Sequence, residues 1–184
     1  MLRIVSGEFG SRRIKSLESN DTRPTTEQVR EAIFNRLGQY FEQGRLLDLF
    51  AGSGAVGFEA LSRGMEQVTL ADKNRAAVNI IKENAKTLKV ENRCEIITGD
   101  YKQVLMRLTG QYDYVFIDPP YAMDVAEKIF STLKNQDLLK ENAWVIVETR
   151  KEKVFEDTYD NLEKVKEAVY GISRVTYFCK KESI

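Results

Sequence analysis

Short apolar runs alternate with helical patterns over most of this 184-residue chain, and this alternation constrains the fold more than any other feature. Parallel strands need crossover connections, and the helical stretches between successive apolar runs supply them. Because a parallel sheet must be covered on both faces, the pattern predicts an α/β protein with helices on either side of the sheet. The predicted strands are Leu46–Phe50, Val68–Ala71, Cys94–Ile97, Tyr112–Ile117 and Ala143–Glu148, and the predicted helices lie over 56–63, 74–88, 101–109 and 123–135.

The N-terminal part of the chain has a different pattern. Spaced apolar positions and two glycines in residues 1–17 favour a short strand, a turn and a second short strand. Thr25 and Gln28 have the form of a capping box, and apolar residues at helical spacing predict a helix over 26–41. We therefore expect a basic N-terminal hairpin or arm over 1–24 and one main domain over 25–184.

The C-terminal part contains two more strand-like segments. Val165–Tyr170 and Arg174–Lys181 are separated by only three residues, among them Gly171. So short a link leaves no room for a crossover helix, and it requires the two strands to pair in the antiparallel sense.

Charge and composition limit the chemistry. Lys+Arg and Asp+Glu are both 28, so attraction of a polyanion must be local, as in residues 1–17, which contain three arginines and one lysine against one glutamate. Histidine is absent, which excludes Ser-His-Asp and Cys-His catalysis and leaves carboxylates, backbone groups or a cofactor. Two cysteines without paired spacing and the lack of a long apolar run favour a cytoplasmic protein that does not cross a membrane.

The segment LLDLFAGSGAVGFEALSRG suggests a cofactor site. Gly52, Gly54 and Gly57 follow a predicted strand with the spacing G-x-G-x-x-G and precede a predicted helix, as in nucleotide-cofactor sites. A dinucleotide would place its pyrophosphate at the helix N-terminus, where the Asp48 carboxylate, four residues before Gly52, would repel it. S-adenosylmethionine has an ammonium group, a sulfonium centre and no phosphate, so it suits this loop better.

Two more carboxylates end the next strands. Asp72 lies 20 residues after Gly52, where an acidic side chain accepts hydrogen bonds from ribose hydroxyls. Asp100 is placed to accept from an adenine amino group, with Tyr101 packed nearby. Ligands of open α/β sheets bind at the carboxyl ends of the strands, so these positions favour one common site. The predicted cofactor residues are Asp48, Ala51, Gly52, Ser53, Gly54, Asp72, Lys73, Asp100 and Tyr101.

The fourth predicted strand runs into Asp118-Pro119-Pro120-Tyr121. Both prolines have a fixed φ and restrict the residue before them, so the turn is stiff before any ligand arrives. Neither proline has an N–H, which leaves the Asp118 carboxylate and backbone carbonyls as acceptors. Such a turn suits the exocyclic amine of a nucleobase or a side-chain amide, because two acceptors favour the pyramidal nitrogen of the transition state. Tyr121 would stack on the base, a contact worth roughly 1–3 kcal/mol.

These residues resemble those of the RsmD family of class I S-adenosylmethionine-dependent methyltransferases, which methylate N2 of a guanine in bacterial 16S ribosomal RNA. The resemblance covers nearly the whole chain, in RIVSGEFGSRRI, TRPTTEQVREAIFN, LDLFAGSGAVGFEALSRG, YDYVFIDPPY and YGISRVTYF. It implies a Rossmann-like, mostly parallel sheet of seven strands with an antiparallel last strand, and an N-terminal β-hairpin that contacts RNA. The expected catalytic residues are Asp118, Pro119 and Tyr121, and the expected RNA contacts are Arg3, Arg12, Arg13, Arg23 and Pro120.

The resemblance also implies partners and leaves alternatives. We expect S-adenosylmethionine as cofactor, S-adenosylhomocysteine as product, no metal, 16S ribosomal RNA or a small-subunit particle as substrate, and no obligate protein partner. Adenine-N6 and glutamine-N5 methyltransferases share D-P-P-Y, so methylation of those nitrogens is an alternative. An NAD-dependent oxidoreductase, which Asp48 and D-P-P-Y disfavour, and a non-catalytic RNA-binding assembly factor are the others. The sequence departs from expectation after Tyr121, where Ala122-Met123-Asp124 brings no positive charge.

Overall fold

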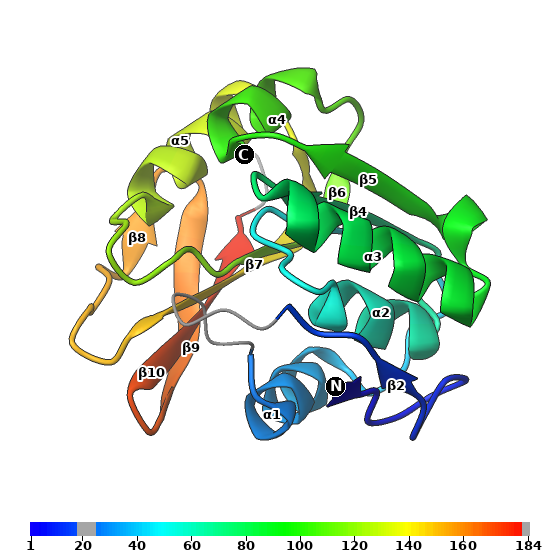
Figure 1. The fold of residues 1–184 in the computed structure, drawn as a ribbon. Helices are drawn as coiled ribbons and strands as arrows, with labels where there is room; N and C mark the ends of the chain where they lie inside the picture. The colour runs from blue at the N-terminus through cyan, green and yellow to red at the C-terminus, as the bar shows by residue number, and fades with distance from the viewer. Residues whose placement is uncertain (18–24, 182–184) are drawn as a thin grey trace. The chain divides into compact units, whose positions relative to one another are not determined.

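The structure, a computed structural model, describes residues 1–17 and 25–181 (Figure 1). Contacts within the chain divide it into two compact units, Met1–Val104 and Leu105–Ile184. Within the described ranges, no helix has both the length and the apolar character that a membrane span requires.

The first unit is built on three parallel strands. They lie in the order β5, β4, β3, and their bounds are Cys94–Thr98, Gln67–Asp72 and Arg45–Asp48. Helix α2 (Ala55–Ser62) packs on β3 and β4, and helix α3 (Arg75–Leu88) packs on β4 and β5 (Figure 1). A 3₁₀ turn, η1 (Glu91–Arg93), leads into β5. The strand–helix alternation predicted for this part of the chain is therefore confirmed.

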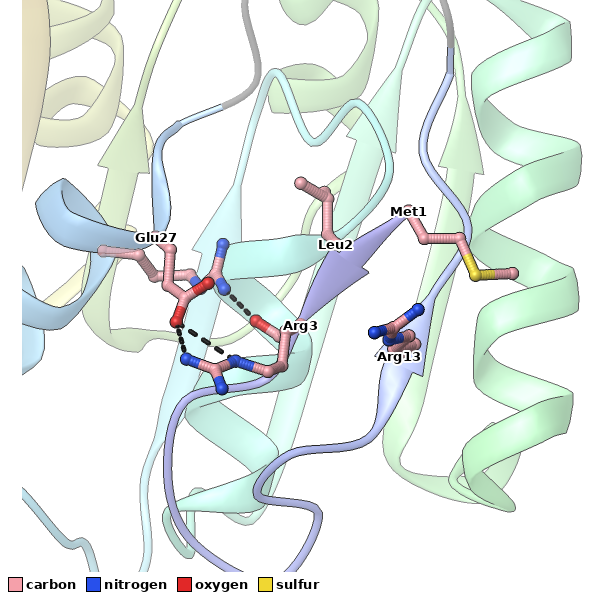
Figure 2. A pocket seen from close by; sticks show the side chains of 6 residues that line it. Met1, Leu2, Arg3, Arg13 and Glu27 are labelled. Atoms are coloured by element: carbon pink, nitrogen blue, oxygen red, sulfur yellow. Dashed lines mark hydrogen bonds and ion pairs between the residues drawn. The ribbon is translucent and has the colours of Figure 1, made fainter.

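The N-terminal residues form the expected hairpin. Strands β1 (Leu2–Arg3) and β2 (Arg13–Ile14) pair in the antiparallel sense, and Arg3 lies directly opposite Arg13 (Figure 2). The hairpin approaches α2 so closely that a Cβ on Gly7 would lie 2.0 Å from the Ser62 carbonyl oxygen. Glycine is therefore required there, and the Ser62 hydroxyl, 2.8 Å from the Phe9 N–H, accepts a hydrogen bond from the hairpin backbone.

Helix α1 (Glu27–Leu37) is shorter than predicted, and its cap differs from the predicted one. Thr26, not Thr25, is the N-cap, since its Oγ1 accepts from the Val29 N–H at 3.2 Å, so the predicted capping box with Gln28 is wrong. The helix ends at Gly38, which has a φ of 124°. Phe41 lies beyond it because its N–H donates to the Arg63 carbonyl at 2.7 Å and its ring packs edge-on against Phe34. Phe41 thus has the spacing of a helical residue, but tertiary contacts determine its position outside the helix.

The second unit combines parallel and antiparallel strands. Strands β6 (Tyr112–Ile117) and β7 (Leu139–Arg150) are parallel, and β10 (Ser173–Lys180) lies antiparallel between β7 and β9 (Leu162–Tyr170). The antiparallel pairing predicted from the short link is confirmed, whereas the two-residue strand β8 (Thr158–Tyr159) was not predicted. Two helices complete the described elements: α5 (Ala126–Asn135) in this unit, and α4 (Tyr101–Arg107), which contains the boundary between the units.

An aromatic cluster forms part of the core of the second unit. The rings of Phe130, Phe155, Tyr159 and Phe178 pack against one another with centroids 5.0 to 6.1 Å apart. Phe130 is in α5, Phe155 is in the loop between β7 and β8, Tyr159 is in β8 and Phe178 is in β10. The cluster therefore joins the helix to the antiparallel strands through tilted and edge-on ring contacts, and aromatic pairs favour edge-on contacts over face-to-face ones.

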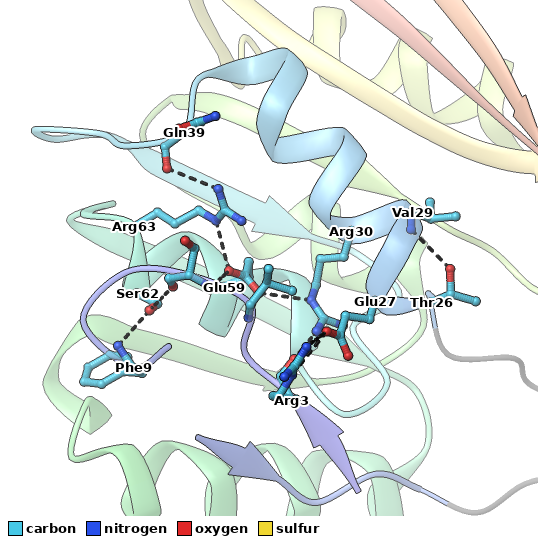
Figure 3. A network of polar contacts seen from close by, with 12 residues as sticks. Arg3, Phe9, Thr26, Glu27, Val29, Arg30, Gln39, Glu59, Ser62 and Arg63 are labelled. Atoms are coloured by element: carbon cyan, nitrogen blue, oxygen red, sulfur yellow. Dashed lines mark hydrogen bonds and ion pairs between the residues drawn. The ribbon is translucent and has the colours of Figure 1, made fainter. Parts of the chain in front are cut away.

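A buried carboxylate organises the first unit. Glu59, in α2 (Figure 3), has no exposed surface, and its two oxygens accept from the backbone N–H groups of Val5 and Ser6 at 2.8 and 3.1 Å. The same carboxylate pairs with Arg30 of α1 at 3.2 Å and with Arg63 at 2.9 Å. One side chain therefore holds the hairpin, α1 and the end of α2 together.

Replacing Glu59 with glutamine should destabilise the protein strongly. The amide can no longer offset two buried guanidinium groups, and loss of one partner of a buried ion pair costs about 3–5 kcal/mol. The matched control is Glu83→Gln, which removes an exposed pair with Lys15, and such pairs contribute about 1 kcal/mol or less. Urea unfolding of both variants measures the difference. Equal midpoints for the two variants would show that Glu59 does not have this role.

Candidate functional site

The glycine loop lies at the carboxyl end of β3. Asp48 is buried, and its Oδ1 accepts from the Phe50 N–H at 3.2 Å. The Ala51 N–H donates to the Ala71 carbonyl at 2.9 Å, which ties the loop to the neighbouring strand. The Gly54 N–H donates back to Ala51 at 2.8 Å and begins α2 in a left-handed conformation. The sequence thus folds into a tight turn that the main chain itself closes.

The three glycines of the loop have different surroundings. A Cβ on Gly54 would lie 2.5 Å from the Phe58 ring, and one on Gly57 would lie 2.4 Å from a Leu70 methyl group. Gly54 therefore leaves room for the Phe58 ring of α2 itself, and Gly57 allows α2 to pack closely against β4. A Cβ on Gly52 would meet nothing within 4 Å, so open space lies beside the Gly52 backbone, where a ligand can approach closely.

Asp72, at the end of β4, is fixed by the main chain. Its two carboxylate oxygens accept from the Gly52 N–H at 2.9 Å and from the Asn74 N–H at 2.8 Å. A carboxylate has about four acceptor positions, so roughly two remain for a ligand with paired hydroxyl groups. The next residue, Lys73, is exposed. The geometry suits a ribose, with the carboxylate held rigidly before binding.

Asp100 and Tyr101 follow β5, as predicted. Asp100 Oδ1 accepts from the Lys102 N–H at 3.0 Å and so caps the start of α4. The buried Tyr101 ring packs against Phe50, with centroids 5.7 Å apart and a tilt of 40°. Sequence reasoning missed Phe50, although its position directly before the glycine loop could have drawn attention to it.

The loop is also attached to α3. The Asn84 amide donates to the Ser53 carbonyl at 3.0 Å and to the Lys15 carbonyl at 2.9 Å. The buried Asn84 thereby connects the glycine loop with the residues that follow the hairpin. Ser53 takes part in this connection through its backbone carbonyl.

The D-P-P-Y turn is at the carboxyl end of β6, in the second unit. Pro119 is buried, Asp118 and Pro120 are half-buried, and a pocket of about 280 Å³ opens beside Pro119, Pro120 and Tyr121. The Tyr121 hydroxyl lies 2.8 Å from the Ser173 hydroxyl, and the Arg150 guanidinium lies 5.4 Å from the centroid of its ring. Two contacts from distant parts of the chain therefore fix the position of the Tyr121 ring.

Positive charge reaches this pocket from the end of β7 and the loop after it. Arg150 and Lys153 line the pocket and supply what residues 122–124 lack. Burial disfavours the charged form of Lys153, but hydrogen bonds to Glu127 and Asp124 outweigh this and raise the pKa of its ammonium group. Lys153 is thus engaged with carboxylates, whereas the Arg150 guanidinium has no ion pair within 25–181, so Arg150 is the cation available to a ligand.

The arginines predicted to contact RNA differ in whether their guanidinium groups already bind other residues of the chain. Arg3 pairs with Glu27, and Arg12 donates to the Thr87 carbonyl at 3.0 Å. Arg13 is exposed, and its guanidinium group has no ion pair or hydrogen bond to the described part of the chain. Arg23 lies outside the described residues. Only Arg13 of the described three therefore has an uncommitted guanidinium group.

Two features of the described side chains concern metal binding and thiol chemistry. Among residues 1–17 and 25–181, no three His, Cys, Asp or Glu side chains are grouped so that they could hold a metal ion. Burial raises the pKa of the Cys94 thiol to about 12, so this side chain stays protonated near neutral pH. Since the thiolate is the nucleophilic form, Cys94 is suited to packing.

Comparison with known proteins identifies the relatives of this chain. The family model described as "Conserved hypothetical protein 95" matches residues 2–179. "Ribosomal RNA small subunit methyltransferase D" of Haemophilus influenzae is 38% identical over 93% of this chain and 90% of its own length. The Escherichia coli enzyme of the same name is 34% identical over 82% of this chain and 76% of its own length.

A solved structure gives the fold. The Escherichia coli protein titled "Putative methyltransferase yhhF" superimposes with a TM-score of 0.86 at 29% identity, covering 99% of both chains. The expected class I methyltransferase fold, with a mostly parallel sheet, an antiparallel last strand and an N-terminal hairpin, is confirmed. The family match and the extent of these alignments agree, and the chain belongs to the RsmD family of class I methyltransferases.

Proposed function

We propose that this protein transfers a methyl group from S-adenosylmethionine to the exocyclic N2 amine of a guanine in small-subunit ribosomal RNA. The observation that carries the proposal is the D-P-P-Y turn, whose Tyr121 ring is held by Ser173 and Arg150. The names of the relatives, small-subunit ribosomal RNA methyltransferases, support this substrate class. The reaction forms an N–C bond, breaks an S–C bond, and releases S-adenosylhomocysteine and a proton.

The cofactor task falls to the first unit. S-adenosylmethionine, when bound, supplies a methyl group made electrophilic by its sulfonium centre. The open space beside Gly52 admits a ligand, and Asp72, fixed by two backbone N–H groups, has acceptors for ribose hydroxyls. Asp48 places negative charge at the loop, which suits a cationic ligand without phosphate. Asp100, Tyr101 and Phe50 are assigned to the adenine, and Ala51, Ser53, Gly54 and Lys73 complete the proposed set.

The acceptor task falls to the second unit. The Asp118 carboxylate and the Pro119 carbonyl accept from the two N–H bonds of the guanine amine. They favour the pyramidal nitrogen that forms only as the methyl group is transferred, and stabilisation confined to the transition state raises the rate. Tyr121 stacks on the extruded base, Pro120 keeps the turn rigid, and Arg150 offers its charge to a neighbouring phosphate. Extrusion of the base costs a few kcal/mol, which the stacking helps to offset.

The direct test is transfer of a radiolabelled methyl group to small ribosomal subunits from a strain that lacks this protein, followed by nucleoside mass spectrometry. The proposal requires one new N2-methylguanosine in the 16S ribosomal RNA. Appearance of N6-methyladenosine would replace the guanine assignment with an adenine one. Absence of transfer to RNA or protein would favour a non-catalytic RNA-binding role.

Substitution of Gly52 with alanine should weaken S-adenosylmethionine binding at least about tenfold, equivalent to about 1.4 kcal/mol, because the methyl group fills the space proposed for the ligand. Gly171→Ala is the matched control. Both glycines have a φ of 59° and nothing within 4 Å of the Cβ position, so the backbone strain is the same. Isothermal titration calorimetry measures the affinity of each variant. Equal loss in both variants would remove Gly52 from the cofactor site.

Replacing Asp118 with alanine should lower kcat by at least roughly 10²–10³, by analogy with loss of an oxyanion-hole donor. Affinity for the cofactor should change little, because Asp118 is assigned to the acceptor amine. Asp113→Asn, in the strand β6 that leads to the D-P-P-Y turn, removes a carboxylate paired with Lys140 at 3.2 Å and should keep normal turnover. Single-turnover methyl transfer with saturating substrate is the measurement. A rate near that of the unmodified enzyme would contradict the role of Asp118.

A further inference from the structure

A second pocket lies within the first unit, at the N-terminal hairpin. It has a volume of about 490 Å³ and is bounded by the hairpin and the first turn of α1 (Figure 2). Its lining carries three guanidinium groups against one carboxylate, an excess of positive charge. The lining residues are Met1, Leu2, Arg3, Arg13, Glu27 and Arg30.

Arg30 brings an unsatisfied donor to this pocket. The residue is 1% exposed, its Nε pairs with Glu59, and its Nη2 donates to the Arg3 carbonyl (Figure 3). Its Nη1 is buried without a hydrogen-bond partner among the residues that the structure describes. Buried polar groups are nearly always satisfied in native proteins, so this donor calls for an acceptor from outside that part of the chain.

The hairpin also holds two like charges in register. Arg3 and Arg13 are directly opposite one another on β1 and β2, which places their side chains on one face. Like charges in this arrangement destabilise a strand pair. Glu27 relieves Arg3 only, and Arg13 has no partner in residues 1–17 or 25–181. An anion in the pocket would relieve the repulsion.

The Glu27 carboxylate marks the position of such an anion. Its Oε1 accepts from both Nε and Nη2 of Arg3, which is the fork that arginine presents equally to carboxylate and phosphate. Arg3 and Glu27 are 54% and 42% exposed, and ion pairs of this kind contribute little stability. A phosphate can therefore displace Glu27 from Arg3 and reach the donors of Arg13 and Arg30.

We propose that this pocket binds one backbone phosphate of the RNA substrate through Arg3, Arg13 and the free Nη1 of Arg30, with Glu27 occupying the position of the phosphate until RNA binds. The inference rests on the proposed function, which supplies RNA as the ligand. It divides the predicted arginines by task, because Arg12 lies outside the pocket lining.

Binding of a fluorescein-labelled single-stranded RNA, followed by anisotropy over a range of salt concentrations, tests the proposal. Arg13→Gln should weaken binding roughly five- to tenfold at low salt and reduce the log–log salt slope by about 0.7, as expected for one lost phosphate contact. Glu27→Gln should tighten binding, because it removes the competing carboxylate. Arg36→Gln is the control, since it removes an exposed positive charge of α1 that lies outside the pocket lining.

Weaker RNA binding by Arg13→Gln together with tighter RNA binding by Glu27→Gln supports the proposal. If Glu27 had only a structural role, its substitution would not strengthen binding. Arg13→Gln with the affinity and slope of Arg36→Gln would overturn it, as would weaker binding by Glu27→Gln. Circular dichroism checks that each variant is folded. Methyl transfer to small subunits is measured separately. Methyl transfer without these binding effects would contradict the phosphate pocket alone. The binding effects without methyl transfer would support the pocket and contradict the enzymatic proposal.

Discussion

The Glu59 carboxylate is the interaction on which the first unit depends. Helix α2 is otherwise apolar or small in its side chains, and all eight of its residues are buried, so a carboxylate there must be matched by donors. It receives two from the hairpin backbone and others from Arg30 and Arg63. The same helix begins at the glycine loop. The proposed cofactor loop and the proposed RNA-binding arm therefore share one rigid support.

Arg30 and Arg63 share the single carboxylate of Glu59, which leaves an excess of buried positive charge. The two arginines differ in their remaining contacts. Arg63 also donates to the Gln39 carbonyl and packs over the Phe34 ring. Arg30 lines the hairpin pocket and keeps one donor unpaired within the described part of the chain. The folding core of the unit and its binding surface are thus electrostatically linked, because the group that locks the hairpin also sets the polarity of the pocket beside it.

Much of this arrangement could be predicted from the sequence. Periodicity and strand-end residues located the glycine loop, Asp72, Asp100 and the D-P-P-Y turn, since each depends on local order along the chain. The Ser173–Tyr121 contact and the cation beside Tyr121 could not be found this way, because they join residues 52 and 29 positions apart. Glu59 was missed although a charge in an apolar helix is a visible signal, and the helix over 26–41 was drawn too long because Phe41 has helical spacing but a tertiary role.

The attachment of the hairpin to Glu59 does not depend on the hairpin's side chains. Val5 and Ser6 meet Glu59 through main-chain N–H groups, which every residue type except proline possesses. Substitutions along the hairpin can therefore change its outward-facing side chains while these backbone hydrogen bonds to Glu59 are kept. Related proteins can therefore differ in the side chains that the hairpin exposes without losing its attachment to α2.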